Sequence, residues 1–148
     1  MSAAAGVAAA DFGGGSYALM GLSAARMHRA AVHRAVALAV VAAPRRRRDL
    51  TLADREATIR FLPRDIEVLQ VERMTTDLGP CLVTTPEQTV LDLVHLPKLG
   101  DMEFEVWNAI DVLLRRCDEA TLEQIADEQR LNAALGRVRS RARQRARN

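Results

Sequence analysis

The sequence has few aromatic residues and almost no lysine. Phe, Trp and Tyr together make up 3% of its 148 residues, so it offers few side chains on which the bases of single-stranded nucleic acid stack. Lys98 is the only lysine among 21 basic residues. A phosphate-loop lysine, a Schiff-base lysine or the lysine of a metal-dependent nuclease would each have to be this residue. Because Lys98 lies in a predicted loop with no glycine-rich stretch before it, none of these chemistries is expected.

Cysteine and histidine are also scarce. Cys81 and Cys117 have no Cys-x-x-Cys spacing and no secretory signal accompanies them, so we expect two reduced core residues. His28, His33 and His95 are too far apart in the sequence to form a recognisable zinc site. No Ser-His-Asp pattern stands out either. The sequence therefore predicts no catalytic residue, no cofactor and no metal.

Long apolar runs are missing as well. No stretch reaches the 18 apolar residues that indicate a membrane-spanning helix. Residues 1–15 are mostly Ala and Gly, and no basic residue precedes Arg26, so the charged start of a signal peptide is absent. We expect residues 1–15 to be a flexible leader that ends at Gly13-Gly14-Gly15, and the protein to be cytoplasmic.

The composition that is present is that of a globular protein. Hydrophobic residues make up 49% and charged residues 27%, which excludes the disordered class of low hydrophobicity and high net charge. A chain of this length buries enough surface for one self-sufficient core. We therefore expect three parts: the leader 1–15, an α+β domain over 16–133 and a basic C-terminal arm over 134–148.

The first two thirds of the sequence contain strand patterns. A helix is predicted over 16–32, because Tyr17, Met20 and Ala24 fall on one helical face. The continuous apolar run Val36–Ala43 predicts a strand buried on both faces in the centre of a sheet. Residues 58–62 alternate in polarity and predict a half-buried strand.

Two further segments predict a hairpin followed by a helix. An extended stretch over 67–75 precedes turn residues and the apolar strand 81–84, with which it is expected to pair. A helix is predicted over 85–96, where Thr85 and Gln88 have the spacing of a capping box and Pro86 occupies the first turn.

After Gly100 the sequence is helical throughout. Trp107 lies beside an apolar stripe and is interpreted as core, and Asp118 is expected to cap a following helix that either continues or breaks near 130–132. The stripe consists of Met102, Val106, Ile110, Leu113, Leu114 and Cys117. The whole order predicts an α+β fold with a small mixed or antiparallel sheet, an N-terminal helix and several C-terminal helices packed on it.

Four consecutive arginines, Arg45 to Arg48, follow the predicted buried strand. A rigid strand would hold them in one exposed loop. Either they form a solvated turn, or they contact an acidic partner or nucleic acid. Arg60 and Arg64 either extend this surface or pair with nearby acids, namely Asp65, Glu67 or Asp92.

The C-terminal arm is the second basic region. It holds six arginines and no acid. Because the formal net charge of the whole chain is +2, the rest of the chain has a net charge of −4. The arginines occupy alternate positions, which on a helix is expected to scatter charge around the cylinder. One interpretation is a frayed tail, and the other is contact with phosphates that specifies no base sequence.

Residues 121–144 also have a weak helix-turn-helix pattern, in which arginines on the second helix would enter a major groove. The usual turn glycine is not in place, because Arg130 and Asn132 occupy that region and Gly136 comes later.

Several segments, in this order and spacing, carry a family resemblance: Gly15–Leu19, Ser23–His28, Pro44–Arg48, Ile59–Phe61 and Val83–Leu93. Over residues 15–130 the sequence resembles the C-terminal domain of AbiEi-family antitoxins, the antitoxin halves of type IV toxin–antitoxin systems. Its composition is similar to that of actinobacterial members.

This resemblance implies a protein that counteracts a nucleotidyltransferase-like toxin encoded beside it. Full-length members also repress their own operon through an N-terminal winged helix, whereas only the Ala/Gly leader precedes Tyr17 here. The paired glycines of the family are reduced to Gly100 followed by Asp101. The resemblance adds no active site.

The leading hypothesis is a non-enzymatic antitoxin or transcriptional regulator whose arginine-rich surface binds the toxin, and DNA through its phosphates, with no membrane partner. The expected binding residues are Arg45, Arg46, Arg47, Arg48, Arg60, Arg64, Arg137, Arg139, Arg141 and Arg143. One alternative is an orphan DNA-associated protein that uses its C-terminal helices. The other is a remnant nuclease-like domain without an active site, for which the sequence lacks an acidic-x-lysine motif after Lys98.

Overall fold

A computed structural model describes residues 4, 16–30, 38–52 and 57–148 of the chain. In these residues the fold is α+β, as predicted: six strands form one mixed sheet, a short helix follows the first strand, and four helices pack on the sheet. The predicted leader, apart from Ala4, lies outside the described residues. The strands are β1 (Ala18–Leu19), β2 (Leu38–Ala43), β3 (Leu50–Leu52), β4 (Ala57–Pro63), β5 (Val71–Thr76) and β6 (Gly79–Thr84). The helices are α2 (Gly21–Met27), α3 (Pro86–His95), α4 (Glu103–Leu113), the 3-10 turn η1 (Leu114–Arg116), α5 (Glu119–Glu128) and α6 (Asn132–Arg147).

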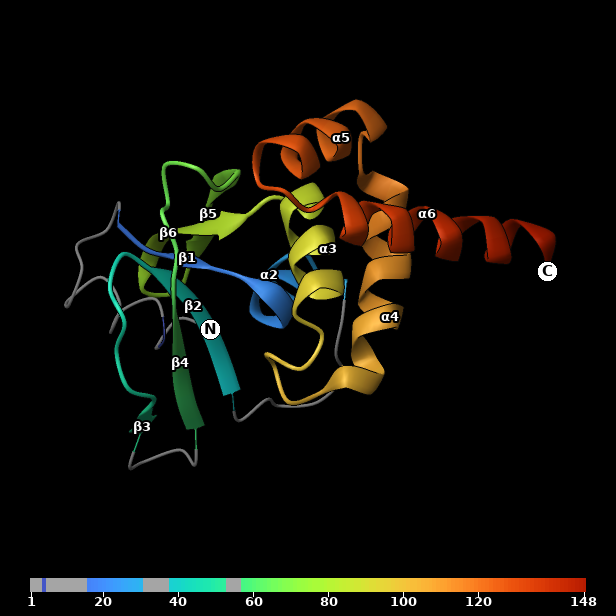
Figure 1. Ribbon diagram of the computed structural model, residues 1–148. Helices are drawn as coiled ribbons and strands as arrows, with labels where there is room; N and C mark the ends of the chain where they lie inside the picture. Colours follow the sequence, from blue (N-terminus) through green and yellow to red (C-terminus); the bar gives the residue numbers. More distant parts are fainter. Residues whose placement is uncertain (1–3, 5–15, 31–37, 53–56) are drawn as a thin grey trace.

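The sheet has the strand order β3-β4-β2-β1-β6-β5. Figure 1 shows the sheet on one side of the molecule and helices α3 to α6 on the other, with α2 between them. Strand β2 runs parallel to β4 and antiparallel to β1, and every residue of β2 is buried. The prediction of a central strand buried on both faces is therefore confirmed for residues 38–43, while 36 and 37 lie outside the described residues.

Strand β4 alternates as predicted. Ile59 and Phe61 are 1% and 5% exposed and pack against Val41 on one face of the sheet. Leu62, on the opposite face, packs with Val40 instead. Because side chains along a strand point alternately to its two faces, Arg60 lies on the face of Leu62.

The predicted helix over 16–32 is wrong at its start. Residues 18 and 19 form β1, which inserts between β2 and β6, and the N–H of Met20 donates to the carbonyl of Val40 at 3.1 Å. The helix begins only at Gly21, whose φ of +58° is a left-handed conformation that glycine adopts without strain. The apolar spacing that indicated a helix is a consequence of burial on both sides of β1. The helix also ends earlier than predicted, at Met27, because residues 28 and 29 form a turn in which Arg29 has a φ of +55°; residues 31 and 32 lie outside the described residues.

The predicted hairpin is confirmed. Strands β5 and β6 pair antiparallel from Val71↔Thr84 to Thr76↔Gly79. The hydroxyl of Thr76 donates to the carbonyl of Gly79 at 2.8 Å and closes the turn. The extended stretch begins at Val71 and not at Glu67, because residues 66–69 form a turn.

Helix α3 begins as predicted, with one difference. The Thr85 hydroxyl accepts from the backbone N–H of Gln88 at 3.3 Å, and Pro86 is the first helical residue. The reciprocal half of the capping box is not made, because the N–H of Thr85 donates to the carbonyl of Gln70 at 3.0 Å. The Gln88 side chain is fully buried and bonds elsewhere.

The C-terminal helices form the larger core. Val106, Ile110 and Leu113 of α4 are at most 1% exposed and pack with Val90 and Leu91 of α3. Asp118 caps α5 as predicted, accepting from the N–H of Thr121 at 2.9 Å. Within the described residues, no helix is long and apolar enough to cross a membrane.

Helices α5 and α6 are separated by a sharp turn, so the second of the two predicted possibilities is correct. Arg130 adopts a φ of +57° in this turn, where a glycine is usual. Helix α6 then continues through Arg147, so the arm is helical and the predicted boundary at 133/134 falls inside its first turn. Ala134, Leu135 and Val138 of α6 are buried against the other helices.

Candidate partner-binding surfaces

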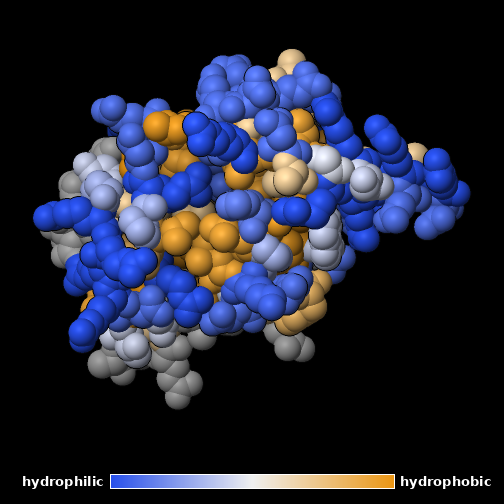
Figure 2. All heavy atoms as spheres, in the orientation of Figure 1, coloured by the Kyte–Doolittle hydropathy of each residue, from blue (hydrophilic) through white to orange (hydrophobic). Residues whose placement is uncertain are grey.

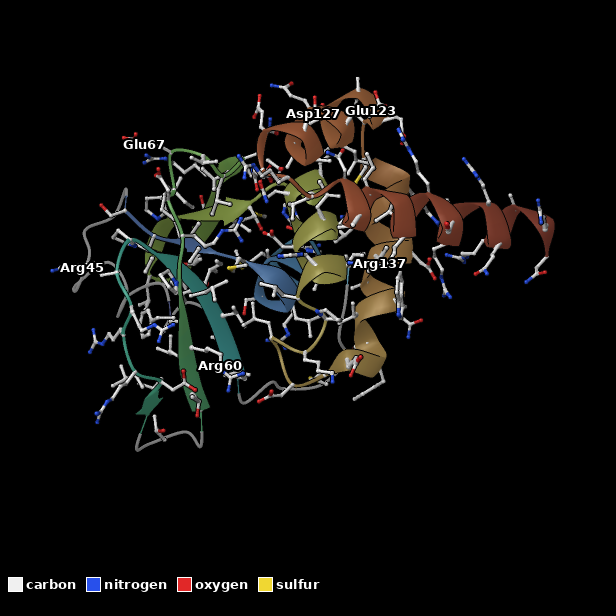
Figure 3. The ribbon with its side chains drawn as sticks, in the orientation of Figure 1. Arg45, Arg60, Glu67, Glu123, Asp127 and Arg137 are labelled. Atoms are coloured by element: carbon white, nitrogen blue, oxygen red, sulfur yellow. The ribbon has the colours of Figure 1, made fainter. Side chains whose placement is uncertain are left out.

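The first candidate surface is the basic segment, Arg45–Arg48, which connects β2 to β3. Arg45, Arg46 and Arg48 are exposed and Arg47 is half-buried. The guanidinium of Arg47 lies 5.3 Å from the centroid of the Phe61 ring, a cation–π contact that ties the segment to the sheet. Figure 3 shows Arg45 at the edge of the molecule that faces away from α3 to α6.

The guanidinium of Arg60 is not available to extend this surface, because it makes three contacts with other residues of the chain. It donates to Asp49 Oδ2 at 3.2 Å, to the carbonyl of Leu99 at 3.0 Å and to Asp101 Oδ1 at 3.3 Å. These contacts join the start of β3 to the loop between α3 and α4. Sequence reasoning missed both acids, because nothing in the sequence shows that Asp101 returns to β4.

Arg64 belongs to a polar cluster made of Arg64, Gln88, Asp92 and Gln129. It donates to Asp92 Oδ1 and to Gln129 Oε1, both at 3.3 Å. Gln88 donates to Asp92 Oδ1 at 3.1 Å and accepts from Gln129 Nε2 at 2.7 Å. Of the three acids proposed as partners of Arg64, Asp92 is the one that is paired. The cluster joins the end of β4, helix α3 and the turn between α5 and α6.

The Asp92 carboxylate is only half satisfied. Its side chain is 1% exposed, and its Oδ2 is buried with no hydrogen-bond partner. Burial raises the pKa of Asp92, and this effect outweighs the lowering by Arg64 and Gln88. The cluster therefore holds a carboxyl group whose charged form is disfavoured.

The second candidate surface is the set of arginines on α6. Arg137 donates to the carbonyl of Val94 at 3.3 Å. Arg141 and Arg145 both pair with Asp111 of α4, at 3.0 and 3.1 Å. Arg141 also lies 5.5 Å from the centroid of the Trp107 ring.

The other arginines of α6 lie on a different side of the helix. Arg139 donates to Glu119 Oε1 at 2.7 Å and also pairs with Glu123, both on α5. Arg143 and Arg147 are exposed, and their side chains make no ion pair or hydrogen bond with the described residues. The arginines are not scattered around the cylinder as expected from the sequence: two sets face two different sides.

The structure thus separates the arginines that the sequence analysis grouped into one surface. The basic segment lies at one end of the molecule, where Figure 3 labels Arg45, and α6 leaves the other end, as Figure 1 shows. Arg60 and Arg64 lie between them in internal contacts. The acidic residues determine which arginines are paired inside the molecule. The sequence does not show which acid lies beside which arginine, because that depends on the fold.

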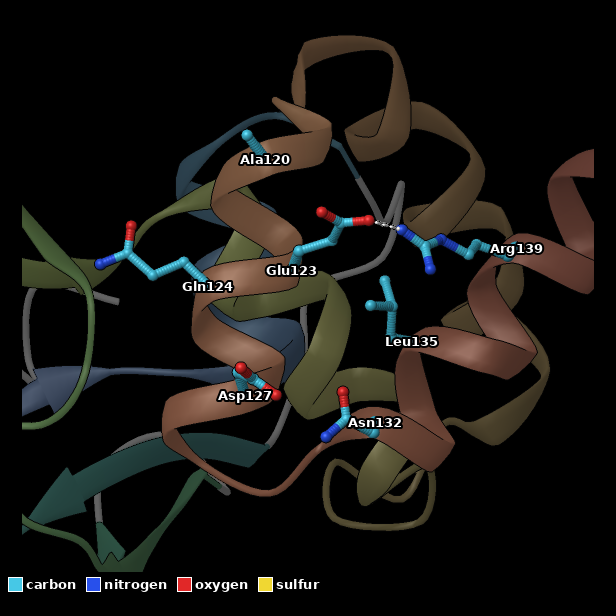
Figure 4. A pocket seen from close by; sticks show the side chains of 7 residues that line it. All are labelled: Ala120, Glu123, Gln124, Asp127, Asn132, Leu135 and Arg139. Atoms are coloured by element: carbon cyan, nitrogen blue, oxygen red, sulfur yellow. Dashed lines mark hydrogen bonds and ion pairs between the residues drawn. The ribbon is translucent and has the colours of Figure 1, made fainter.

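An open hollow of about 440 Å³ lies between α5 and α6 (Figure 4). The ion pair between Glu123 and Arg139 spans it, and Asp127 adds one further acid to its lining. Its lining residues are Ala120, Glu123, Gln124, Asp127, Asn132, Leu135 and Arg139. No group of three or more metal-binding side chains occurs in the part of the chain that the structure describes.

The two cysteines and His28 lie in environments that indicate a structural role. Cys81 is buried and Cys117 half-buried, and both are free thiols. Burial, with smaller contributions from Glu87 and Glu119, raises the pKa of Cys117 to about 12, so its nucleophilic thiolate is negligible at neutral pH. His28 Nε2 lies 2.8 Å from the carbonyl of Thr84 in the core, and His33 lies outside the described residues.

Comparison of this chain with models of protein families and with curated proteins finds no match.

Proposed function

We propose that this protein is a non-catalytic antitoxin-type regulator that neutralises a nucleotidyltransferase-like toxin, and that the basic segment Arg45–Arg48 contacts an acidic surface of that toxin. The sequence resemblance to AbiEi-family antitoxins supplies the partner class. The observation that supports this choice of surface is that the four arginines follow the end of β2, a strand whose every residue is buried.

The physical argument concerns how the arginines are held. The residues that flank the segment are paired in β2 and β3, and Arg47 is fixed over Phe61. A basic loop on a rigid support keeps its charges close together before a partner arrives. Such a surface steers an acidic partner and accelerates its association. Arginine also binds carboxylates through two parallel hydrogen bonds, which fixes the partner's orientation.

The proposal is tested by replacing two exposed arginines of the segment, in the variant Arg46→Ala/Arg48→Ala. The toxin is the nucleotidyltransferase-like protein encoded in the adjacent reading frame. In bacteria that express this toxin, we expect the native antitoxin to restore growth. We expect the variant to restore growth poorly and to bind the purified toxin about tenfold more weakly at low salt.

The matched control is Arg73→Ala/Arg115→Ala, which removes the same charge from exposed positions on β5 and η1. This control should restore growth as the native protein does. If no such toxin is encoded nearby, or if the native protein binds it without restoring growth, the antitoxin proposal is wrong. If growth is restored equally by the Arg46/Arg48 variant, the basic segment is not the contact surface.

A DNA-associated role is the second candidate function, because α5, its tight turn and α6 form a helix pair with a strongly basic second helix. This role uses a different surface and does not depend on the toxin.

A further inference from the structure

The C-terminal half of α6 extends beyond the body of the molecule. Figure 1 shows that its last turns have no other element beside them, and Figure 2 shows this end covered with hydrophilic side chains. Arg141 is half-buried, and every residue from 142 to 148 is exposed. This part of the helix holds no acid, no aromatic residue and no large aliphatic residue. Its only apolar side chains are the methyl groups of Ala142 and Ala146.

The alternate spacing of the arginines has a definite consequence once the arm is helical. Each residue turns an α-helix by about 100°, so positions four apart lie about 40° from each other and neighbouring arginines lie about 160° apart. The six arginines therefore form two rows on nearly opposite sides of the cylinder. One row is Arg137, Arg141 and Arg145, and the other is Arg139, Arg143 and Arg147. The contacts agree, because the first row meets Val94 and Asp111 while Arg139 meets α5.

The charge of the two rows is only partly compensated. Asp111 forms ion pairs with both Arg141 and Arg145, while Glu119 and Glu123 form ion pairs with Arg139. No acid among the described residues pairs with Arg143 or Arg147. Of the arginines in the ion pairs, Arg145 is the most exposed, with 48% of its side chain accessible. The projecting end is therefore a strongly positive rod with charge on two sides.

We propose that this rod, residues 140–147 of α6, binds the major groove of duplex DNA and that its two arginine rows face the two phosphate backbones. The groove is about 12 Å wide, which admits one α-helix of about 10–12 Å diameter. A helix seated there has a phosphate backbone on each side, and two opposite rows of guanidiniums match this arrangement. The rod offers Gln144 and Ser140 as its uncharged polar side chains, so the contact is mainly to phosphates and is largely independent of base sequence.

Other polyanions fit the rod less well. A single strand is usually bound by aromatic side chains that stack on its bases, and the rod has none. The major groove of duplex RNA is deep and too narrow for side chains to read. A membrane surface binds helices with one apolar face, whereas here both sides are charged.

Asp111 determines how many arginines of the rod are available to bind phosphates. Its side chain is 12% exposed and holds two arginines of the first row. A phosphate must therefore compete with Asp111 for Arg141 and Arg145, whereas Arg143 and Arg147 are immediately available. Replacing Asp111 by asparagine removes the competing charge and keeps the side-chain shape.

The experiment measures the affinity of the full-length protein for a labelled DNA duplex of about 20 base pairs, between about 50 and 200 mM salt. For Arg143→Ala/Arg147→Ala we expect about tenfold weaker binding and a salt dependence shallower by about two counterions. For Asp111→Asn we expect the opposite, tighter binding with a steeper salt dependence. The control Arg73→Ala/Arg115→Ala, which removes equal charge elsewhere, should bind as the native protein does.

A second readout reports on the first row. Trp107 is the only tryptophan in the sequence, and Arg141 lies over its ring, so DNA that draws Arg141 away should change the tryptophan emission. An unchanged emission in the bound complex overturns the two-row arrangement. The proposal is also overturned if the duplex does not bind at the lowest salt, if the single strand binds as tightly, or if the control loses as much affinity as the test variant.

The toxin and DNA proposals fail separately. Arg46→Ala/Arg48→Ala should keep the native affinity for the duplex. If it abolishes DNA binding while Arg143→Ala/Arg147→Ala does not, the basic segment is the DNA surface and the inference about α6 is wrong.

Discussion

At the scale of single residues, the most unusual group is the Asp92 carboxylate. It is almost fully enclosed, and its Oδ1 accepts two hydrogen bonds while its Oδ2 accepts none. Pairing with Arg64 does not make such a site strongly stabilising, because removing both charges from water costs about as much as their attraction returns. We interpret the polar cluster as a device that fixes the turn before α6 relative to the sheet.

The buried environment of Asp92 predicts that the stability of the variant Asp92→Asn, relative to the native protein, depends on pH. An acid whose pKa is raised in the folded state binds its proton more tightly there. The free energy of unfolding of the native protein therefore falls as pH rises from the unfolded pKa of about 3.9 through the raised folded pKa. Asparagine does not titrate, so the stability of Asp92→Asn relative to the native protein should increase across this interval and then level off. Urea unfolding between about pH 4 and pH 8 measures the difference, and a relative stability that decreases with pH would contradict the prediction.

At the scale of elements, the start of α3 depends on a single side-chain cap. Since the Gln88 side chain does not return to Thr85, the Thr85 hydroxyl is the side-chain partner of the first turn. Replacing Thr85 by alanine should lower the free energy of unfolding by about 1 kcal/mol. Thr85→Ser keeps the hydroxyl and should lose much less. Denaturant unfolding of both variants tests this, and equal losses would show that the methyl group of Thr85 matters and the cap does not.

The elements also show what sequence alone could predict. Strand β2, the β5–β6 hairpin and the caps of α3 and α5 follow from local patterns, and all are present. Strand β1 was missed because two residues buried between neighbouring strands have no periodicity of their own. The partners of Arg60 and Arg139 could not be predicted, since an ion pair across the fold leaves no spacing in the sequence. For the same reason the arginines of the basic segment and of α6 were grouped together although they lie far apart.

At the scale of the whole molecule, α6 combines a buried first half with a projecting second half. Ala134, Leu135 and Val138 are at most 4% exposed, whereas the residues after Arg141 are exposed. A chain that ends after Ser140 loses the ion pairs of Arg141 and Arg145 with Asp111 and the contact of Arg141 with Trp107, and should lose only about 1 kcal/mol of stability. A chain that ends after Leu131 also loses two large buried side chains and should lose about 3 kcal/mol or more. Thermal and urea unfolding of the two truncations provide the measurement.

The two truncations also separate stability from binding. The longer one should fold normally and lose its affinity for duplex DNA. If it unfolds as readily as the shorter one, the projecting half of α6 is part of the core and not a separate binding element.

The brevity of β1 has a consequence for how the sheet comes apart. Its two residues form the ladder that links β2 and β4 on one side to the β5–β6 hairpin on the other, through the single parallel register pair Leu19↔Val83. Because β1 is so short, we expect the sheet to unfold as two cooperative units, each held together by a longer strand pair: β2 with β4, and β5 with β6. Local fluctuations should release the hairpin as one unit while β2 and β4 keep their amide protons, so slow hydrogen exchange would be concentrated on the β2–β4 side of Leu19.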